Sequence, residues 1–200
     1  MTADEFTSDL APCYGDALRY CRALCVAWSP SEAEDILQEA LLRAFKSYKS
    51  LEDRTKFRPW LFKIITRVFQ SASRRAYWKR LVPLEARYAD AHFPAVYQDL
   101  DYMNGHPELF RALSELRVKD RAAILLFEVG GFSIQEIVSI QGERSQSAVK
   151  SRLSRARSRL RRLLSQSPQP EASTRSEAAT TTIERLTYEA ISAANNNRAV

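Results

Sequence analysis

One stretch of the chain is both strongly basic and strongly periodic. Residues 147–164 read SAVKSRLSRARSRLRRLL and contain seven Lys or Arg and no acidic residue. Apolar residues recur there at steps of four and three: Val149, Leu153, Ala156, Leu160 and Leu163. This spacing predicts a helix that buries one stripe and carries positive charge over its other faces. Such a helix packs on other elements along the stripe and is suited to bind a polyanion.

The residues before this stretch predict a helix-turn-helix. The sequence SIQEIVSIQG indicates a short helix that starts with a Ser133–Glu136 capping box and ends at Gly142, and the next helix starts near Ser145. In this motif the first turns of the second helix enter the major groove, and arginines further along meet phosphates. The alternative is a solvated basic helix in a bundle. The DNA-binding interpretation predicts contacts from Ser145, Gln146, Ser147, Lys150, Ser151, Arg152, Arg155, Arg157 and Arg159.

The rest of the chain predicts an all-α fold, because it has long segments of 3.6-residue period and only five glycines. Helices are expected over residues 5–28, from a Ser31–Glu34 capping box onward, and from about residue 55 to Arg80. A second helical set runs from Glu108, with one helix ending at Gly130 and Gly131. We therefore expect two small helical domains, 5–82 and 108–165, joined by a linker, 83–107. Residues 166–200 have the composition of a mostly disordered extension, in which 183–191 has the pattern of a short amphipathic helix.

The segment from Arg54 to Arg80 combines nine Lys or Arg with interleaved aromatic residues and has no acid. Basic groups attract phosphates and aromatic faces stack on unpaired bases. The spacing of Trp60 with Ile64 and Val68 favours packing, and Tyr77 and Trp78 fit either nucleic acid or a domain-boundary anchor. The candidate contacts in this segment are Arg54, Lys56, Phe57, Arg58, Lys63, Arg67, Ser71, Arg74, Arg75, Tyr77 and Trp78.

A third candidate surface is acidic. Glu34, Asp35, Gln38 and Glu39 fall on the polar side of one predicted helix. They are either favourable charges near a helix N-terminus or a protein-binding face, and periodicity does not decide between the two.

The composition of the chain limits the classes of function that it can be expected to have. The net charge of +6 favours a nucleic acid, or else an anionic membrane surface, as partner. No apolar run approaches a membrane span and the N-terminus lacks signal-peptide features, so we expect a cytoplasmic protein without membrane insertion.

Cys13, Cys21 and Cys25 are expected to be buried structural thiols, the alternative being a metal or redox sensor. We expect no enzyme, no cofactor and no metal site, because no phosphate-cradling glycine loop or nucleophile–base pair is recognisable.

Two blocks of the sequence together resemble a known family. SEAEDILQEALLRAFKSYKSL with KFRPWLFKIITRV resembles region 2 of bacterial RNA polymerase sigma factors of the extracytoplasmic-function (ECF) group. LSELRVKDRAAILLFEVGGFSIQEI with AVKSRLSRARSRLRRLL resembles their region 4. The resemblance covers about residues 5–165, with both blocks in the family's order and spacing.

The resemblance implies an alternative sigma factor that binds core RNA polymerase and promoter DNA. It implies that the Glu34–Glu39 face docks on the β′ clamp helices, with a second contact to the β flap. The loop Leu51–Phe57 and the following helix would melt and read the −10 element, and the helix-turn-helix would read the −35 element. An anti-sigma factor is an implied partner, and a polymerase-bound chain would lie on the nucleoid. The alternative is a sigma-like DNA-binding regulator that does not bind polymerase productively.

The sequence departs from the family's pattern at three places. Arg67 and Ser71 stand where the family usually has Asn and Asp, so its −10 preference does not transfer. The turn GERS, Gly142 to Ser145, is one residue longer than usual and charged, which affects the angle of the recognition helix. Ala148 stands where Thr is frequent and lacks its polar contact.

Overall fold

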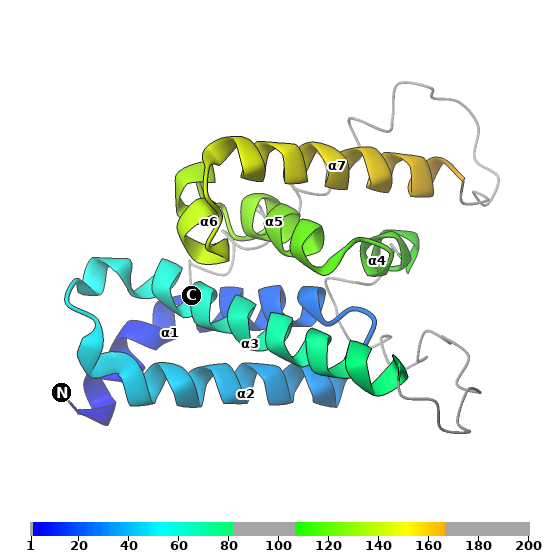
Figure 1. The fold of residues 1–200 in the computed structure, drawn as a ribbon. Helices are drawn as coiled ribbons and strands as arrows, with labels where there is room; N and C mark the ends of the chain where they lie inside the picture. The colour runs from blue at the N-terminus through cyan, green and yellow to red at the C-terminus, as the bar shows by residue number, and fades with distance from the viewer. Residues whose placement is uncertain (1, 82–106, 167–200) are drawn as a thin grey trace, which may run out of the picture.

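The computed structural model describes residues 2–81 and 107–166, and these residues form helices joined by short loops (Figure 1). Seven α-helices and two short 3₁₀ turns occur within the described ranges, without a β-strand among them. The prediction of an all-α fold is therefore confirmed. Most of the predicted linker 83–107, and the extension with its possible helix at 183–191, lie outside the described residues.

The N-terminal domain is a bundle of three helices: α1 (Ala3–Leu24), α2 (Pro30–Ser47) and α3 (Phe57–Leu81). Two 3₁₀ turns, η1 (Tyr48–Ser50) and η2 (Arg54–Lys56), connect α2 to α3, and α3 begins close to the predicted start near residue 55. Tyr20, Leu24 and Phe62 are among the fully buried side chains of the core. The hydroxyls of Tyr20 and Thr66 share a buried hydrogen bond of 2.8 Å, which leaves neither polar group unsatisfied.

The start of α2 differs from the prediction. The N-cap is Ser29 rather than Ser31, and its capping box closes with Glu32 rather than Glu34. Both serines are followed by Glu three residues later, so the pattern alone fits either. Pro30 decides the start, because proline has no N–H to donate and is favoured in the first position of a helix.

The C-terminal domain contains α4 (Pro107–Ser114), α5 (Val118–Glu128), α6 (Ile134–Gln141) and α7 (Gln146–Ser165). The predicted Ser133–Glu136 capping box is present, and Gly142 ends α6 in the left-handed conformation at φ 65°. Helix α5 ends at Glu128, two residues before the predicted Gly130. The predicted stripe of α7 is buried at Val149, Leu153, Ala156 and Leu160, and it packs mainly on α4, α5 and α6.

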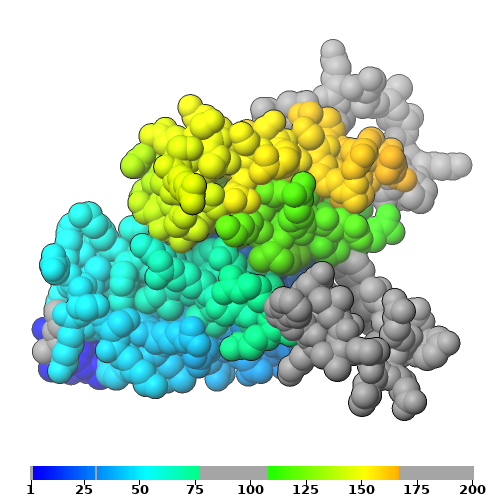
Figure 2. Space-filling view, in the orientation of Figure 1, coloured from blue at the N-terminus to red at the C-terminus, as the bar shows by residue number. Residues whose placement is uncertain are grey.

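The two domains lie directly against each other. Helices α5 and α6 rest on α1 and α3, while α7 lies on the far side of the C-terminal domain (Figures 1 and 2). The rings of Phe62 in α3 and Phe132, before α6, meet edge to face with their centroids 4.9 Å apart. The first helix of the helix-turn-helix is therefore also a contact between domains.

Candidate DNA-binding and protein-docking surfaces

The first turns of α7 present a row of exposed polar side chains. Ser145 caps the helix by accepting a hydrogen bond of 3.2 Å from the amide of Ala148. Gln146 Nε2 donates to Gln135 Oε1 at 2.7 Å, which ties α7 to α6. Ser147, Lys150 and Ser151 are exposed. This is the arrangement in which a recognition helix offers hydroxyl, amide and ammonium groups to base edges.

The arginines further along α7 are engaged within the domain. Arg155 lies 3.6 Å from Asp120, Arg157 lies 2.8 Å from Glu128, and Arg159 lies 3.6 Å from Glu115. All three remain at least 38% exposed, so a phosphate can compete with the carboxylate. Arg144, Arg161 and Arg162 are exposed and have no ion pair in the described part of the chain, although they were not among the predicted contacts.

Arg152 has a different position from the other predicted DNA contacts. Its side chain is only 17% exposed, and its guanidinium lies 2.7 Å from Glu143 and 3.4 Å from Asp120. Lys119 also reaches Glu143, at 3.4 Å. Glu143 belongs to the unusually long GERS turn, so these cations hold the turn against α5 and α7. The Arg152 side chain therefore positions the turn and is less exposed than those of Arg155, Arg157 and Arg159.

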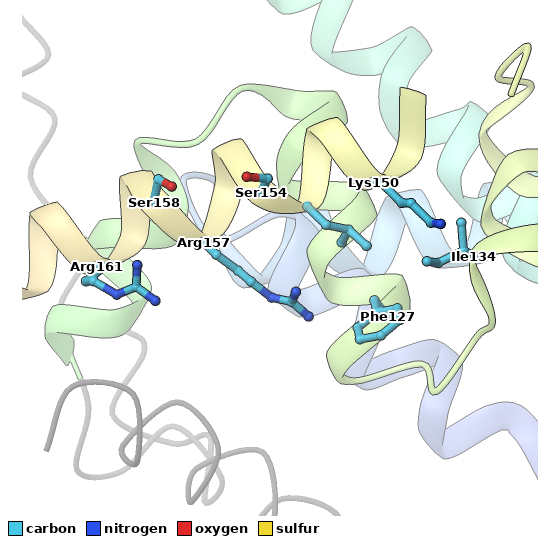
Figure 3. Close-up of a pocket in the computed structure, with 8 residues that line it drawn as sticks. Phe127, Ile134, Lys150, Ser154, Arg157, Ser158 and Arg161 are labelled. Carbon is cyan, nitrogen blue, oxygen red and sulfur yellow. The ribbon is translucent and has the colours of Figure 1, made fainter. Parts of the chain in front are cut away.

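A hollow of about 300 Å³ lies beside α7, where the helix passes α5 and the start of α6 (Figure 3). Its walls combine apolar side chains with hydroxyls and three cations, Lys150, Arg157 and Arg161, spaced along one side of α7. The guanidinium of Arg157 lies 5.2 Å from the ring of Phe127, which forms part of the floor. Cations and hydroxyls at this spacing suit the oxygens of a sugar–phosphate chain.

The loop before α3 is held by local hydrogen bonds. Asp53 accepts from the hydroxyl of Thr55 at 2.6 Å and from its amide at 3.0 Å, and it pairs with Lys56 at 3.2 Å. The hydrogen bond from the Thr55 side chain, followed by that from Lys56, lowers the pKa of the Asp53 carboxyl. Arg54 lies 3.1 Å from Glu5 and over the ring of Tyr48. Arg54 and Lys56 remain exposed beside this loop.

Phe57 is a core residue and does not present its ring to a ligand. It is 4% exposed and packs edge to face on Phe6 and Tyr48, with Trp60 beside it. The prediction that Phe57 contacts nucleic acid is therefore corrected, because a base cannot stack on a ring whose faces are covered. The prediction that Trp60 serves packing is confirmed.

The exposed face of α3 is basic along its length. Arg67, Arg74 and Arg75 are exposed and Lys63 is half-buried. Ser71 accepts a hydrogen bond of 3.1 Å from Arg74. The backbone of Tyr77 and Trp78 belongs to α3, and their side chains lie outside the described part of the structure.

Arg58 is the member of the predicted set that lies at the contact between domains. Its Nη2 donates to the carbonyl oxygen of Gly130 at 2.7 Å and to Asp16 at 3.1 Å. Local sequence patterns could not predict this contact, because the two partners are 72 and 42 residues away from Arg58.

Helix α2 presents the acidic face as an exposed surface. Glu34, Asp35, Gln38 and Glu39 are all exposed, and Glu39 pairs with Arg43 at 2.6 Å. Two large apolar residues continue the same face toward the C-terminus of the helix: Leu42 is 55% exposed and Phe45 is 47% exposed. The sequence alone does not single out Leu42, because Leu41 and Leu42 are adjacent and either could continue the buried side of the helix. An apolar centre beside polar groups is typical of a protein-docking site.

The three cysteines are buried in the N-terminal domain, as predicted, and none forms a disulfide. A hydrogen bond with Cys21 raises the pKa of the Cys25 thiol, and burial adds to this shift. Burial also raises the pKa of Cys13.

The described residues contain no cluster of three metal-ligating side chains. None of the helices in the described ranges combines the length and apolar character needed to span a bilayer.

The fold and these surfaces define a two-domain helical DNA-binding protein that also carries an exposed acidic face. Family models agree on both halves: Sigma-70 region 2 matches residues 12–79, and Sigma-70 region 4 matches residues 106–160. The chain is 32% identical over 145 residues to the ECF RNA polymerase sigma factor EcfG of Rhodopseudomonas palustris, covering 71% of this chain and 76% of EcfG. It is 33% identical over 133 residues to SigM of Mycobacterium tuberculosis, covering 66% of this chain and 64% of SigM.

A solved structure gives the same result. The sigma factor RpoE of Bartonella quintana, in complex with the anti-sigma factor NepR, matches with a TM-score of 0.64 and 28% identity. The match covers 83% of this chain and all of that one. The chain belongs to the ECF group of RNA polymerase sigma factors. It is an alternative sigma factor, whose partners are RNA polymerase and promoter DNA.

Proposed function

We propose that the two domains divide promoter recognition between them. The first turns of α7 read the −35 element in the major groove, with Gln146, Ser147 and Ser151 toward base edges. The exposed cations of α7, including those of the hollow in Figure 3, bind phosphates and set the position of the helix. The η1–η2 loop and the basic face of α3 engage the −10 element, and the more basic character given by Arg67 alters its sequence preference.

The acidic face of α2 is the proposed site for the polymerase β′ clamp helices. Its exposed carboxylates attract a basic partner. The exposed Leu42 side chain supplies apolar surface that is buried from water when the partner binds. The β flap is the proposed partner of the C-terminal domain. The observation that supports the whole assignment is that one chain presents an acidic, partly apolar face on one domain and a basic recognition helix on the other.

We also propose that an anti-sigma factor regulates this chain, because a similar sigma factor was solved bound to one. The structural relative RpoE was solved in complex with NepR. A protein of similar role that covers the α2 face or α7 would prevent polymerase or promoter binding by this chain. A protein with this role works in the bacterial cytoplasm, on the nucleoid when bound to polymerase.

A paired binding experiment tests the assignment. The double variant Asp35→Ala, Glu39→Ala is expected to lose affinity for core RNA polymerase while keeping its affinity for duplex DNA. Asp4→Ala, which removes an exposed acid from α1, is the matched control and is expected to retain both. Full polymerase affinity in the double variant would contradict the docking assignment. Absence of polymerase binding by the wild-type chain would favour a stand-alone DNA-binding regulator.

A further inference from the structure

The first turns of α1 lie at the same end of the N-terminal domain as the η1–η2 loop, and side chains join the two (Figure 1). Arg54 Nη2, at the start of η2, lies 3.1 Å from Glu5 Oε2 of α1. The hydroxyl of Tyr48, at the start of η1, donates to Asp9 Oδ2 at 2.5 Å. Because the two carboxylates are one helical turn apart on the same face of α1, one short stretch of that helix contacts both 3₁₀ turns.

An aromatic contact fixes the same loop to the core. The guanidinium carbon of Arg54 lies 5.5 Å from the ring centroid of Tyr48. Tyr48 is 2% exposed, and its ring packs edge to face on those of Phe6 and Phe57 at centroid distances of 5.3 and 5.9 Å. Arg54 therefore contacts a ring that the core holds in place as well as a carboxylate of α1.

Glu5 is itself held before it pairs with the loop. Its carboxylate accepts a hydrogen bond of 3.1 Å from the amide of Thr2 and completes the capping box of α1. This hydrogen bond, with a contribution from Arg54, lowers the pKa of the Glu5 carboxyl, which keeps it negatively charged. A side chain already fixed by its own helix loses less conformational entropy when it pairs with Arg54.

The two cations of η2 differ in how freely they can meet DNA. The Lys56 side chain is 73% exposed and pairs within the turn with Asp53, so a phosphate can displace that weak surface pair. The Arg54 side chain is 42% exposed and joins the loop to α1. A phosphate that drew Arg54 away from Glu5 would break this connection. The geometry therefore suits Lys56 to phosphate binding and Arg54 to holding the loop.

We propose that Glu5 and Asp9 are positioning residues for the −10 contact of the η1–η2 loop. They act through Arg54 and Tyr48, and the Arg54 guanidinium does not itself bind DNA. The Sigma-70 region 2 match begins at residue 12, so both carboxylates precede the matched segment. The effect on −10 recognition rests on the proposed function, whereas the connection between α1 and the loop does not.

Amide hydrogen exchange, measured by NMR on the free full-length chain, tests the connection between α1 and the loop. The Lys56 amide donates to the carbonyl oxygen of Asp53 at 3.1 Å, so its exchange rate reports on the order of η2. Glu5→Gln removes the charge that pairs with Arg54 and keeps the capping box, in which Gln also serves. Asp4→Asn removes an exposed charge from the same turn of α1 and is the matched control.

Glu5→Gln and Arg54→Ala are each expected to speed exchange of the Lys56 amide by up to about fivefold, the upper range for one exposed ion pair. Tyr48→Phe, which removes only a hydroxyl, is expected to act in the same direction. The Asp4→Asn chain should exchange at the wild-type rate. Equal exchange rates in the wild-type and Glu5→Gln chains would show that α1 does not hold the loop.

Binding to single-stranded DNA tests the consequence for the −10 element. The chain, bound to core RNA polymerase, is titrated with the −10 strand of a promoter selected from a transcription library and with a scrambled strand of the same composition. Glu5→Gln and Arg54→Ala are each expected to lower the ratio of the two affinities by up to about fivefold. The double variant should lower it no further, because both changes remove one contact. The slope of log K against log salt should not change.

A direct phosphate contact by Arg54 predicts opposite signs for the two variants. Glu5→Gln would then free the guanidinium and tighten binding, while Arg54→Ala would weaken binding to both strands and reduce the salt slope by about 0.7, the value for a single strand. That result would overturn the positioning role. A wild-type complex that does not distinguish the two strands would contradict the proposed function of the loop instead, and the exchange rates of the free chain would still decide whether α1 holds it.

Discussion

Arg152 Nη2 lies 2.7 Å from Glu143 Oε1, so the recognition helix is tied to the turn that precedes it. Lys119 and Asp120 of α5 complete this network, through Glu143 and Arg152 respectively. The extra, charged residue of the turn therefore has a structural role: its carboxylate orients α7 relative to α5. The orientation of α7 relative to α5 is set by an ion-pair network in which Arg152, Glu143 and Asp120 have little exposure to solvent.

Replacing Arg152 by Ala is expected to destabilise the C-terminal domain by about 2 kcal/mol, because two poorly exposed carboxylates lose a charged hydrogen-bond donor. Arg144→Ala removes an exposed arginine from the same turn and is the control, with little expected change. Urea unfolding of both variants measures the difference. Equal free energies of unfolding would show that the network does not hold the turn.

Replacing Lys150 by Ala is expected to weaken DNA binding and to reduce the slope of log K against log salt by about 0.9, the value for one phosphate contact. Lys46→Ala removes an exposed lysine from α2 and should leave the slope unchanged. Binding to one promoter duplex is measured at several salt concentrations. A reduced affinity with an unchanged slope, seen only on certain sequences, would assign Lys150 to base recognition instead.

Replacing Leu42 by Ala is expected to weaken core polymerase binding about tenfold, equivalent to about 1.4 kcal/mol, because an exposed leucine at the centre of a docking face is buried on binding. The stability of the chain should not fall, since the side chain is already half in water. Val129→Ala, at an apolar residue of 43% exposure in the other domain, is the comparison. Similar polymerase affinities for the two variants would place the docking centre elsewhere on α2.

The native thiols are expected to resist alkylation at neutral pH. The Cys21 hydrogen bond and burial raise the pKa of Cys25, and burial raises that of Cys13, so the reactive thiolate is scarce and inaccessible. Labelling with a maleimide should be slow in the folded chain and fast in denaturant. Rapid labelling of the folded chain, together with an effect on transcription, would support the sensor alternative for the cysteines.

Local patterns in the sequence predict most of the helices. The α7 stripe and the Ser133–Glu136 cap depend on residues within one or two turns of each other, so spacing alone identifies them. The start of α2 shows the limit, because Ser29 and Ser31 carry the same motif and only the position of Pro30 separates them.

Contacts between distant residues could not be predicted in this way. Phe57 lies in a basic, aromatic segment that is typical of nucleic-acid binding, yet Phe6 and Tyr48 cover its ring. Arg58 lies in the same segment and contacts the opposite domain. Composition identifies the charge of a surface, but tertiary packing decides which of its residues face solvent.

Transcription from a promoter library tests the central claim most directly. The purified chain is added to bacterial core RNA polymerase and the start sites of the transcripts are sequenced. Initiation is expected downstream of a shared −35 and −10 pair, and it should be lost in the Asp35→Ala, Glu39→Ala variant. No stimulated initiation, with duplex DNA binding intact, would contradict a role in promoter-directed initiation.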